Sequence, residues 1–200
     1  IKEGFDDQHW MNKSAIHALD TFTNGNYIKY PFIPEGSDER QYSSPGVRIV
    51  TPSIHKSKYY EYDEYHTSAD NLDFISSSDL LLTLDLYKKW IENIESYCHP
   101  KRKNSFCEFQ LGKRGLYPNL GGSINQPAQN ENIISNHEPK LISNKHIKIT
   151  NKHLDAYNWI MHLADGTKSN FDIAERSGLS LDIIDQSIEI FYQKNLLILK

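Results

Sequence analysis

Apolar side chains recur at helical spacing in two stretches of the first hundred residues. In residues 12–23 they fall at positions i, i+3, i+4 and i+7, which predicts a short helix that Asn24 and Gly25 end. Residues 79–96 repeat the pattern over a longer stretch, after serines at 76–78 that are suited to capping a helix N-terminus. We expect this second helix to pack on a sheet through its apolar positions, which are Leu80, Leu81, Leu84, Tyr87, Ile91 and Ile94.

Two runs between these helices are rich in β-branched and aromatic residues, as is typical of strands. Residues 27–33 form the first run and residues 47–54 the second, and Pro31 moves the first toward a sheet edge because proline lacks an N–H. Helix and strand therefore alternate, so we expect residues 1–97 to be part of an α/β sheet domain. Loops at strand ends are where such sheets place their sites, which draws attention to the polar residues between the runs.

The composition changes at residues 98–150 to Asn, Ser, Gly, Pro and Lys, which predicts an extended arm or linker. Cys98, His99 and Cys107 lie there, but two thiols and one imidazole lack the fourth ligand of a structural zinc site. Residues 110–118, QLGKRGLYP, hold glycines and cations, yet Pro118 argues against the helix that a phosphate-binding loop requires. We expect this block to dock on the first domain or on a neighbouring subunit.

Helical spacing returns in residues 151–200, which are predicted to form three helices and a terminal strand. This order resembles a winged helix-turn-helix domain, a fold widely used to read DNA. Charge opposes that use, because the stretch has five Lys and Arg against seven Asp and Glu, and its third helix carries Asp182, Asp185 and Glu189. We therefore expect protein–protein contact and no binding of nucleic acid.

The composition narrows the class of protein further. A hydrophobic content of 38% indicates a globular chain, and a net charge of -4 gives no general attraction to nucleic acid or anionic membranes. No apolar run reaches the length of a membrane span. Two cysteines and no signal-like N-terminus fit a reducing compartment, so we expect a cytoplasmic protein with no membrane partner.

Two polar segments hold the candidate site residues. The first, GSDERQY at 36–42, follows a turn and brings Asp38, Arg40 and Gln41 close together in sequence. The second, EYHTSADN at 64–71, sets the imidazole of His66 beside Tyr65 and among hydroxyl and carboxyl groups that suit the surroundings of a metal ligand. A solvated loop has a similar composition, so the residue types alone leave that alternative open.

In their order, the two segments resemble the closing half of a zinc aminopeptidase domain. The resemblance is to co-catalytic zinc exopeptidases related to bacterial leucyl aminopeptidases and glutaminyl cyclases, whose last metal ligand is the His of a Tyr-His-Thr-x-x-Asp segment. More narrowly, residues 38–46, 64–74 and 110–118 resemble a bacterial subgroup with a C-terminal winged-helix domain, although position 43 is Ser where many members carry Cys. The implied fold is the C-terminal part of a zinc-exopeptidase-like α/β sheet domain, followed by a small winged helix-turn-helix domain.

This resemblance implies metal-dependent hydrolysis of a peptide or amide bond, with zinc as the cofactor. It makes His66 a metal ligand and Asp38 a catalytic pocket carboxylate, and it suggests that Arg40, Gln41 and Tyr65 bind substrate. An ion pair of Arg40 with a neighbouring glutamate is an equally weighted alternative. The other ligands would lie upstream on a longer polypeptide, so whether this chain takes part in an enzyme stays open. We also expect a homo-oligomer.

Two other functions compete with hydrolysis. An aminopeptidase-like shell without catalysis would be an interaction module in a complex, for example with enzymes of surface-polysaccharide or peptide modification. A winged-helix DNA-binding regulator is the third possibility, and the charge of residues 151–200 opposes it.

Overall fold

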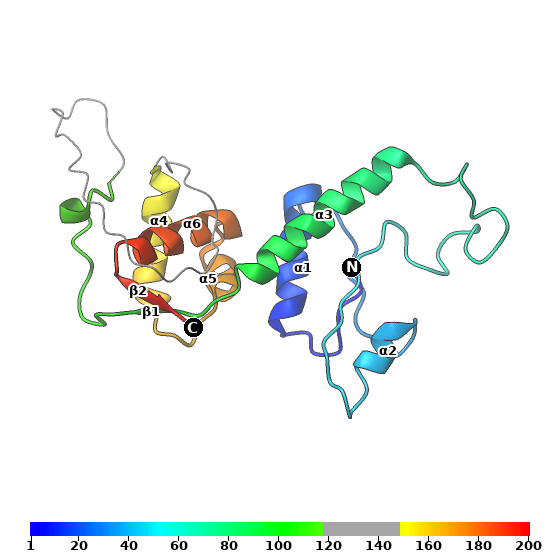
Figure 1. Ribbon diagram of the computed structural model, residues 1–200, viewed down its shortest axis with the longest axis horizontal. Coiled ribbons are helices and arrows are strands. Elements are labelled where there is room, and N and C mark those ends of the chain that lie inside the picture. Colours follow the sequence, from blue (N-terminus) through cyan, green and yellow to red (C-terminus); the bar gives the residue numbers. More distant parts are fainter. Residues whose placement is uncertain (118–148) are drawn as a thin grey trace, which may run out of the picture. The chain divides into compact units, whose positions relative to one another are not determined.

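The computed structural model describes residues 1–117 and 149–200, which form two compact units, Ile1–Cys98 and His99–Lys200 (Figure 1). The first unit contains the helices α1 (Trp10–Thr23), α2 (Asp38–Tyr42) and α3 (Ser77–Glu95). The second contains, in chain order, β1 (Pro100–Arg102), a 3-10 helix (Gly112–Arg114), α4 (Asn151–Leu163), α5 (Asn170–Ser177), α6 (Leu181–Gln193) and β2 (Leu197–Leu199). None of the helices in the described residues is long and apolar enough to cross a membrane.

The two long helices of the first unit confirm the helices predicted for residues 12–23 and 79–96. Asn24 ends α1 in a left-handed conformation with φ 51°, and its N–H donates to the carbonyl of Asp20. The hydroxyl of Ser76 accepts the N–H of Asp79 at 3.1 Å and so caps α3. Both helix ends therefore lie where the polar residues of the sequence place them.

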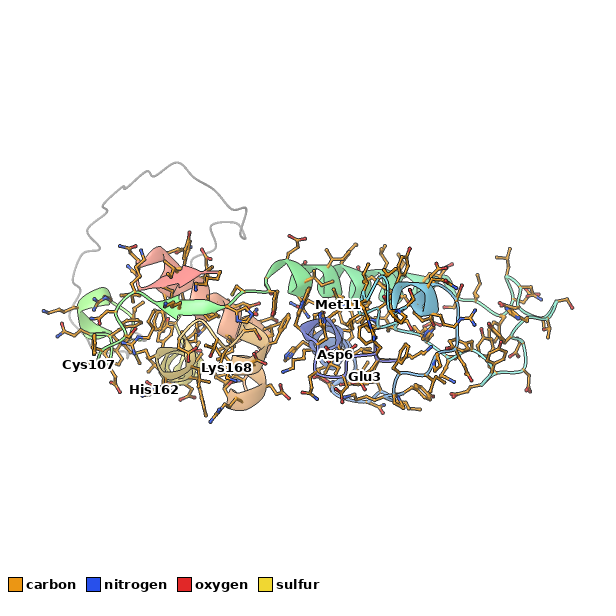
Figure 2. All side chains as sticks on the ribbon, turned by 90° about the horizontal axis from the view of Figure 1, so that it is seen from below. Glu3, Asp6, Met11, Cys107, His162 and Lys168 are labelled. Atoms are coloured by element: carbon orange, nitrogen blue, oxygen red, sulfur yellow. The ribbon has the colours of Figure 1, made fainter. Side chains whose placement is uncertain are left out.

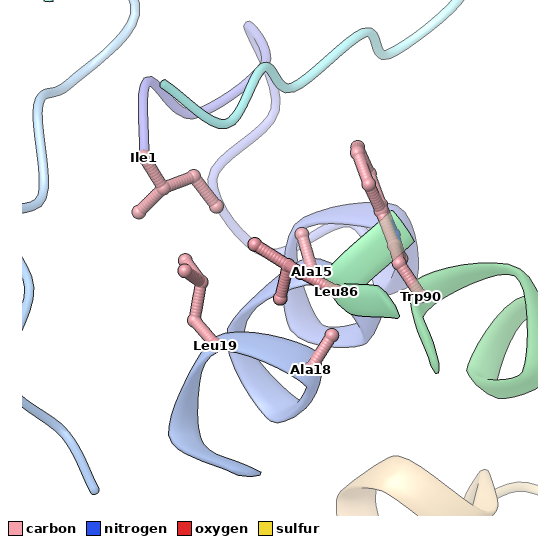
Figure 3. Packing of buried hydrophobic residues seen from close by; sticks show 6 residues of the cluster. All are labelled: Ile1, Ala15, Ala18, Leu19, Leu86 and Trp90. Carbon is pink, nitrogen blue, oxygen red and sulfur yellow. The ribbon is translucent and has the colours of Figure 1, made fainter. Parts of the chain in front are cut away.

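The hydrophobic core of the first unit lies where α3 crosses α1 (Figure 1). Ala15 and Ala18 are fully buried and let the helices approach closely, while Leu86 and Trp90 of α3 cover them (Figure 3). A polar contact is built into this core. The indole N–H of Trp90 donates to the hydroxyl of Ser14 at 2.9 Å, so burial leaves neither group unsatisfied.

The strands predicted at residues 27–33 and 47–54 are absent, and among residues 1–98 there is no sheet. Each run contributes one bridging residue, because Lys2 pairs in parallel with Tyr30 and antiparallel with Ser53. Pro31 follows one bridge and Pro52 precedes the other, so each run lacks a backbone donor beside its paired residue. In place of the expected α/β sheet, two bridges at Lys2 join the three segments.

The prediction that α3 packs on a sheet is also wrong, although the helix itself was predicted correctly. The predicted apolar face is largely exposed, and the helix turns a different side, with Leu86 and Trp90, toward α1. We call the exposed side the apolar face of α3; it consists of Leu80, Leu81, Leu84, Tyr87 and Ile91. Without a sheet in residues 1–98, this face has no layer to cover it within the first unit.

The second unit confirms the three helices and the terminal strand predicted for residues 151–200. Ser169 and Asp172 form a capping box at the start of α5, and Gly178 ends it with φ 68°. β1 and β2 pair antiparallel, with Pro100 opposite Leu199. These are the elements that the predicted winged helix requires, and the winged-helix assignment itself stays a prediction.

The first part of the predicted arm belongs to the second unit. Besides β1, this part contributes the buried side chains of Leu111 and Leu116, and the ring of Phe109 meets Phe191 edge-on at 5.3 Å. Residues 110–117 therefore pack within the C-terminal unit. The expected docking of the block QLGKRGLYP on the first domain or on a neighbouring subunit stays a prediction. Residues 118–148 of the arm lie outside the described residues.

Replacing Ser14 should destabilise the first unit. Ser14→Ala removes the acceptor of the buried Trp90 indole N–H, which is expected to lower the free energy of unfolding by about 1–3 kcal/mol. Amide hydrogen exchange in α1 and α3 measures this loss. Thr21→Ala is the matched control, because the Thr21 hydroxyl is exposed and bonds only to a backbone carbonyl of the same helix. Equal effects of both variants would contradict the prediction.

Replacing Tyr157 should stabilise the second unit. Its ring stacks on Phe191 at 4.7 Å, but its buried hydroxyl has no hydrogen-bond partner in the described structure, and burial raises the pKa of Tyr157 to about 12. Tyr157→Phe keeps the stacking and removes the unsatisfied group, so protection of amides in α4 and α6 should rise by about 1 kcal/mol. Tyr192→Phe, at an exposed position, should change nothing. A loss of protection in Tyr157→Phe would show that the hydroxyl has a partner.

Candidate functional site

The first predicted segment forms α2, whose five residues begin at Asp38. Asp38, Arg40 and Gln41 are exposed along it, whereas the carboxylate of Glu39 turns inward. That carboxylate accepts the backbone N–H of Ser37 at 3.0 Å and the ammonium of Lys2 at 3.2 Å. The helix is too short to be stable by itself, so these contacts hold the segment in place.

Lys2 lies beneath this segment and is only 1% exposed. Its ammonium donates to the carbonyl of Glu35, to the carboxylate of Glu39 and, at 3.0 Å, to the hydroxyl of Tyr59. It also lies over the rings of Phe32 and Tyr59, at 5.9 and 5.7 Å from their centroids. A buried ammonium group requires such partners, because water is not there to solvate it.

Tyr59 belongs to a cluster of aromatic rings that leads to the second predicted segment. Its ring lies 6.3 Å from Tyr65, and Tyr65 stacks on the imidazole of His66 with 4.0 Å between the centroids. Desolvation and the nearby hydroxyls of Tyr60 and Tyr62 raise the pKa of Tyr65. The cluster fixes the plane of the His66 ring on one side.

His66 occupies a left-handed backbone conformation, with φ 59°, in a series of turns. The hydroxyl of Thr67 donates to the carbonyl of Glu64 at 2.8 Å and braces this turn from the following residue. A residue other than glycine rarely adopts this conformation, and such strain is often found at functional positions. The imidazole is exposed, so it is open to a ligand from outside the segment.

The described residues do not form a complete metal site. Residues 1–117 and 149–200 contain no group of three or more His, Cys, Asp or Glu side chains placed to hold a metal ion. His66 alone is one imidazole, and a single imidazole binds zinc weakly. Its role as a metal ligand therefore stays a prediction, and it requires ligands from elsewhere.

The structure bears on the alternative considered for Arg40. Glu39, one possible partner in a structural ion pair, bonds to Lys2 instead. Across the part of the chain that the structure describes, Arg40 forms no ion pair. Its guanidinium group is thus available to bind an anion, as the predicted substrate contact requires.

Lys2, Glu39 and Tyr59 organise the segments that carry the predicted site residues, but the sequence did not single them out. A lone lysine is normally solvent-exposed, and no spacing rule marks it as buried. For Tyr59, the run of tyrosines at 59–65 is a compositional signal that could have indicated an aromatic cluster.

A shallow hollow lies in the second unit, and no predicted site residue lines it. Lys168, labelled in Figure 2, lines it together with Leu163, Asp172, Glu175 and Arg176. Its charged residues have mixed sign, and it contains none of the residues from the two predicted segments. The hollow therefore gives no support to the catalytic prediction.

Comparison with known proteins agrees with the resemblance seen in the sequence. A family model described as a domain of unknown function, DUF4910, matches residues 3–97. A Clostridium acetobutylicum protein is 34% identical over 171 residues, which cover 86% of this chain and 34% of the relative. Its name assigns it to polysaccharide biosynthesis and gives it an aminopeptidase-like domain.

A crystal structure from the same organism, of a protein named as a peptidase, shares 27% identity with a TM-score of 0.69. The match covers 100% of this chain and 38% of the crystallised chain. The chain is similar to aminopeptidase-like proteins. It spans about a third of the length of these relatives. At this identity the comparisons support an aminopeptidase-like family, and they leave the zinc and winged-helix assignments as predictions.

Glu39 should make the first unit sensitive to acid. Burial acts to raise the pKa of Glu39, but hydrogen bonds from the backbone N–H groups of Glu39 and Ser37 and from Lys2 outweigh it and hold the pKa below its usual 4.5. Because the folded pKa lies below the unfolded one, the stabilisation is complete above the unfolded pKa and is lost as pH falls through the folded pKa.

Glu39→Gln should therefore be less stable than the natural chain at pH 7 and should lose less of its remaining stability on acidification, over roughly pH 5 to 3. Amide exchange in α1 and α3 across this range measures the difference. Glu95→Gln is the control, since Glu95 is exposed at the end of α3. Parallel pH profiles for Glu39→Gln and the natural chain would refute the assignment.

Proposed function

We propose that this chain forms part of an aminopeptidase-like hydrolase that cleaves a peptide or amide bond with the help of zinc. The observation that carries the proposal is the exposed His66 imidazole, presented on a strained turn within the Tyr-His-Thr-Ser-Ala-Asp segment. The similarity to proteins named as peptidases and as aminopeptidase-like supports the same reaction class. Bound zinc would supply an activated water and polarise the scissile carbonyl.

Each predicted residue has a role that its placement allows. His66 supplies one ligand, and Tyr65, predicted to bind substrate, also orients the His66 ring by stacking at 4.0 Å. The carboxylate of Asp38, exposed at the start of α2, is suited to accept a proton or bind a substrate amine. The fork of Arg40 suits a substrate carboxylate, with the Gln41 amide as a neutral hydrogen-bonding neighbour.

The proposal requires further ligands from another polypeptide segment, either of the same protein or of a partner subunit. The apolar face of α3 supports such a contact, because a contiguous group of exposed leucine and isoleucine side chains usually marks a surface that another segment covers. The relatives are about two and a half times as long as this chain, so they contain residues that this chain does not match.

A second candidate function is a non-catalytic interaction module. One observation favours it: a relative is named for polysaccharide biosynthesis. An aminopeptidase-like shell that had lost catalysis would keep the same fold and the same apolar face of α3. Metal content separates the two functions.

Zinc analysis of the intact natural polypeptide tests the proposal. We expect bound zinc by elemental mass spectrometry, and His66→Ala should lose about one zinc per chain and all amide hydrolysis, because a missing ligand opens the site. Asp38→Asn should keep the zinc and lose turnover, since a pocket carboxylate acts on protons and substrate charge.

His162→Ala is the matched control, because His162, labelled in Figure 2, is an exposed histidine of the second unit that bonds to the Asn158 carbonyl. Zinc content and hydrolysis should be unchanged in this variant. Equal zinc in the natural protein and in His66→Ala would rule out the metal-ligand role, and absence of zinc from both would favour the interaction module.

A further inference from the structure

We propose that the buried ammonium group of Lys2 couples the two segments of the candidate site, so that Lys2 is a positioning residue for both Asp38 and His66. The catalytic meaning of this coupling rests on the proposed function. The coupling itself is a property of the first unit and is testable in this chain without any activity.

The hydrogen bonds of Lys2 are saturated by the two segments together with the residues that lead into them, so that the coupled stretches are 35–42 and 59–71. An ammonium group has three donors, and here each has one acceptor: the carbonyl of Glu35, the carboxylate of Glu39 and the hydroxyl of Tyr59. With the side chain 1% exposed, water does not replace a lost partner easily. Movement of either segment away from Lys2 therefore leaves a buried charge with an unmatched donor.

The backbone of Lys2 is fixed as firmly as its side chain. Its N–H donates to the Ser53 carbonyl at 2.9 Å and its carbonyl accepts from the Ser53 N–H at 3.0 Å. On the other side, Tyr30 bonds to the residues that flank Lys2, with its N–H on Ile1 and its carbonyl on Glu3. The ammonium group thus projects from an anchored backbone and serves as a fixed point for both segments.

The first segment is shaped around this fixed point. The carboxylate of Glu39 folds back over Gly36 to reach Lys2, and a Cβ at Gly36 would lie 1.9 Å from its Oε1 atom. Gly36 also has φ 107°, which other residues rarely adopt. Position 36 therefore requires glycine, and the turn that it allows places Asp38 at the first position of α2.

The second segment reaches the same fixed point through aromatic rings. The Tyr59 hydroxyl bonds to Lys2, and the Tyr59 ring contacts Tyr60 edge-on at 5.4 Å. Tyr60 in turn meets Tyr65 at 5.0 Å, and Tyr65 stacks on His66. Among the described residues neither Glu39 nor Lys2 forms a hydrogen bond or ion pair with His66, so the aromatic rings provide the path from Lys2 to the imidazole.

Hydrogen exchange by mass spectrometry on the whole chain tests the coupling. In Lys2→Met, exchange in residues 35–42 and in residues 59–71 should rise at least about tenfold, as expected for losing hydrogen bonds from a charged group. Exchange in α1, α3 and the second unit should stay near that of the natural chain. Lys2→Arg keeps the charge and should restore part of the protection.

Milder variants keep the proposal testable if Lys2→Met does not fold. Tyr59→Phe removes one acceptor from the second segment, and it should also raise exchange in residues 35–42, to which the Tyr59 hydroxyl is linked through Lys2. Glu39→Gln should shift the imidazole resonances of His66 in a ¹H–¹⁵N spectrum. Effects confined to the segment that carries the substitution would overturn the proposal.

The outcome is independent of the zinc experiment. If exchange in the two segments is coupled but His66→Ala retains its zinc, Lys2 positions these segments and the hydrolase proposal fails. If His66→Ala loses zinc while Lys2→Met and Tyr59→Phe leave the other segment unchanged, the hydrolase proposal stands and the positioning role is wrong.

Discussion

The polar half of the first unit depends on one buried cation. The segments at 35–42 and 59–71 have few buried apolar side chains of their own, so hydrophobic packing cannot specify their positions. Lys2 replaces that packing with directional contacts. Each of its three N–H groups forms a good hydrogen bond only over a narrow range of distances and angles to its acceptor. A buried charge is costly when a partner is missing, and this cost favours one arrangement of the two segments over others.

The apolar half of the same unit follows a different rule. Ile1, the residue next to Lys2, belongs to the cluster that α1 and α3 form, so the first two residues serve both halves. The few polar atoms within that cluster are hydrogen-bonded to one another. The Ser14 hydroxyl accepts from the Trp90 indole N–H, and the Ser14 carbonyl accepts from the Asn93 side-chain amide. Matched polar groups of this kind fix which side of α3 faces α1.

The helices of both units could be predicted from local features. Ser76, Asn24 and Gly178 act through their own backbone and nearest neighbours, so their effect is readable in the sequence. The strands at 27–33 and 47–54 could not be judged in this way, because a strand needs a partner segment and only Lys2 pairs with them. The buried state of Lys2 likewise depends on residues more than thirty positions away. The candidate segments were recognisable by resemblance, while the contacts that hold them were not.

The sheet of the second unit has a consequence for how the chain is synthesised. β1 precedes α4, α5 and α6, and β2 follows them, so the pairing of Pro100 with Leu199 joins two segments separated by almost the whole unit. Contacts of such large sequence separation form late, because the chain between them has to be ordered first. During translation the three helices leave the ribosome before β2 does. One edge of β1 can by then pair with residues 164–166, because the Arg102 N–H donates to the Ala164 carbonyl and the Pro100 carbonyl accepts from Gly166, while the edge that β2 covers is still open. The nascent unit is therefore most vulnerable to wrong strand pairing in the interval before its last strand emerges.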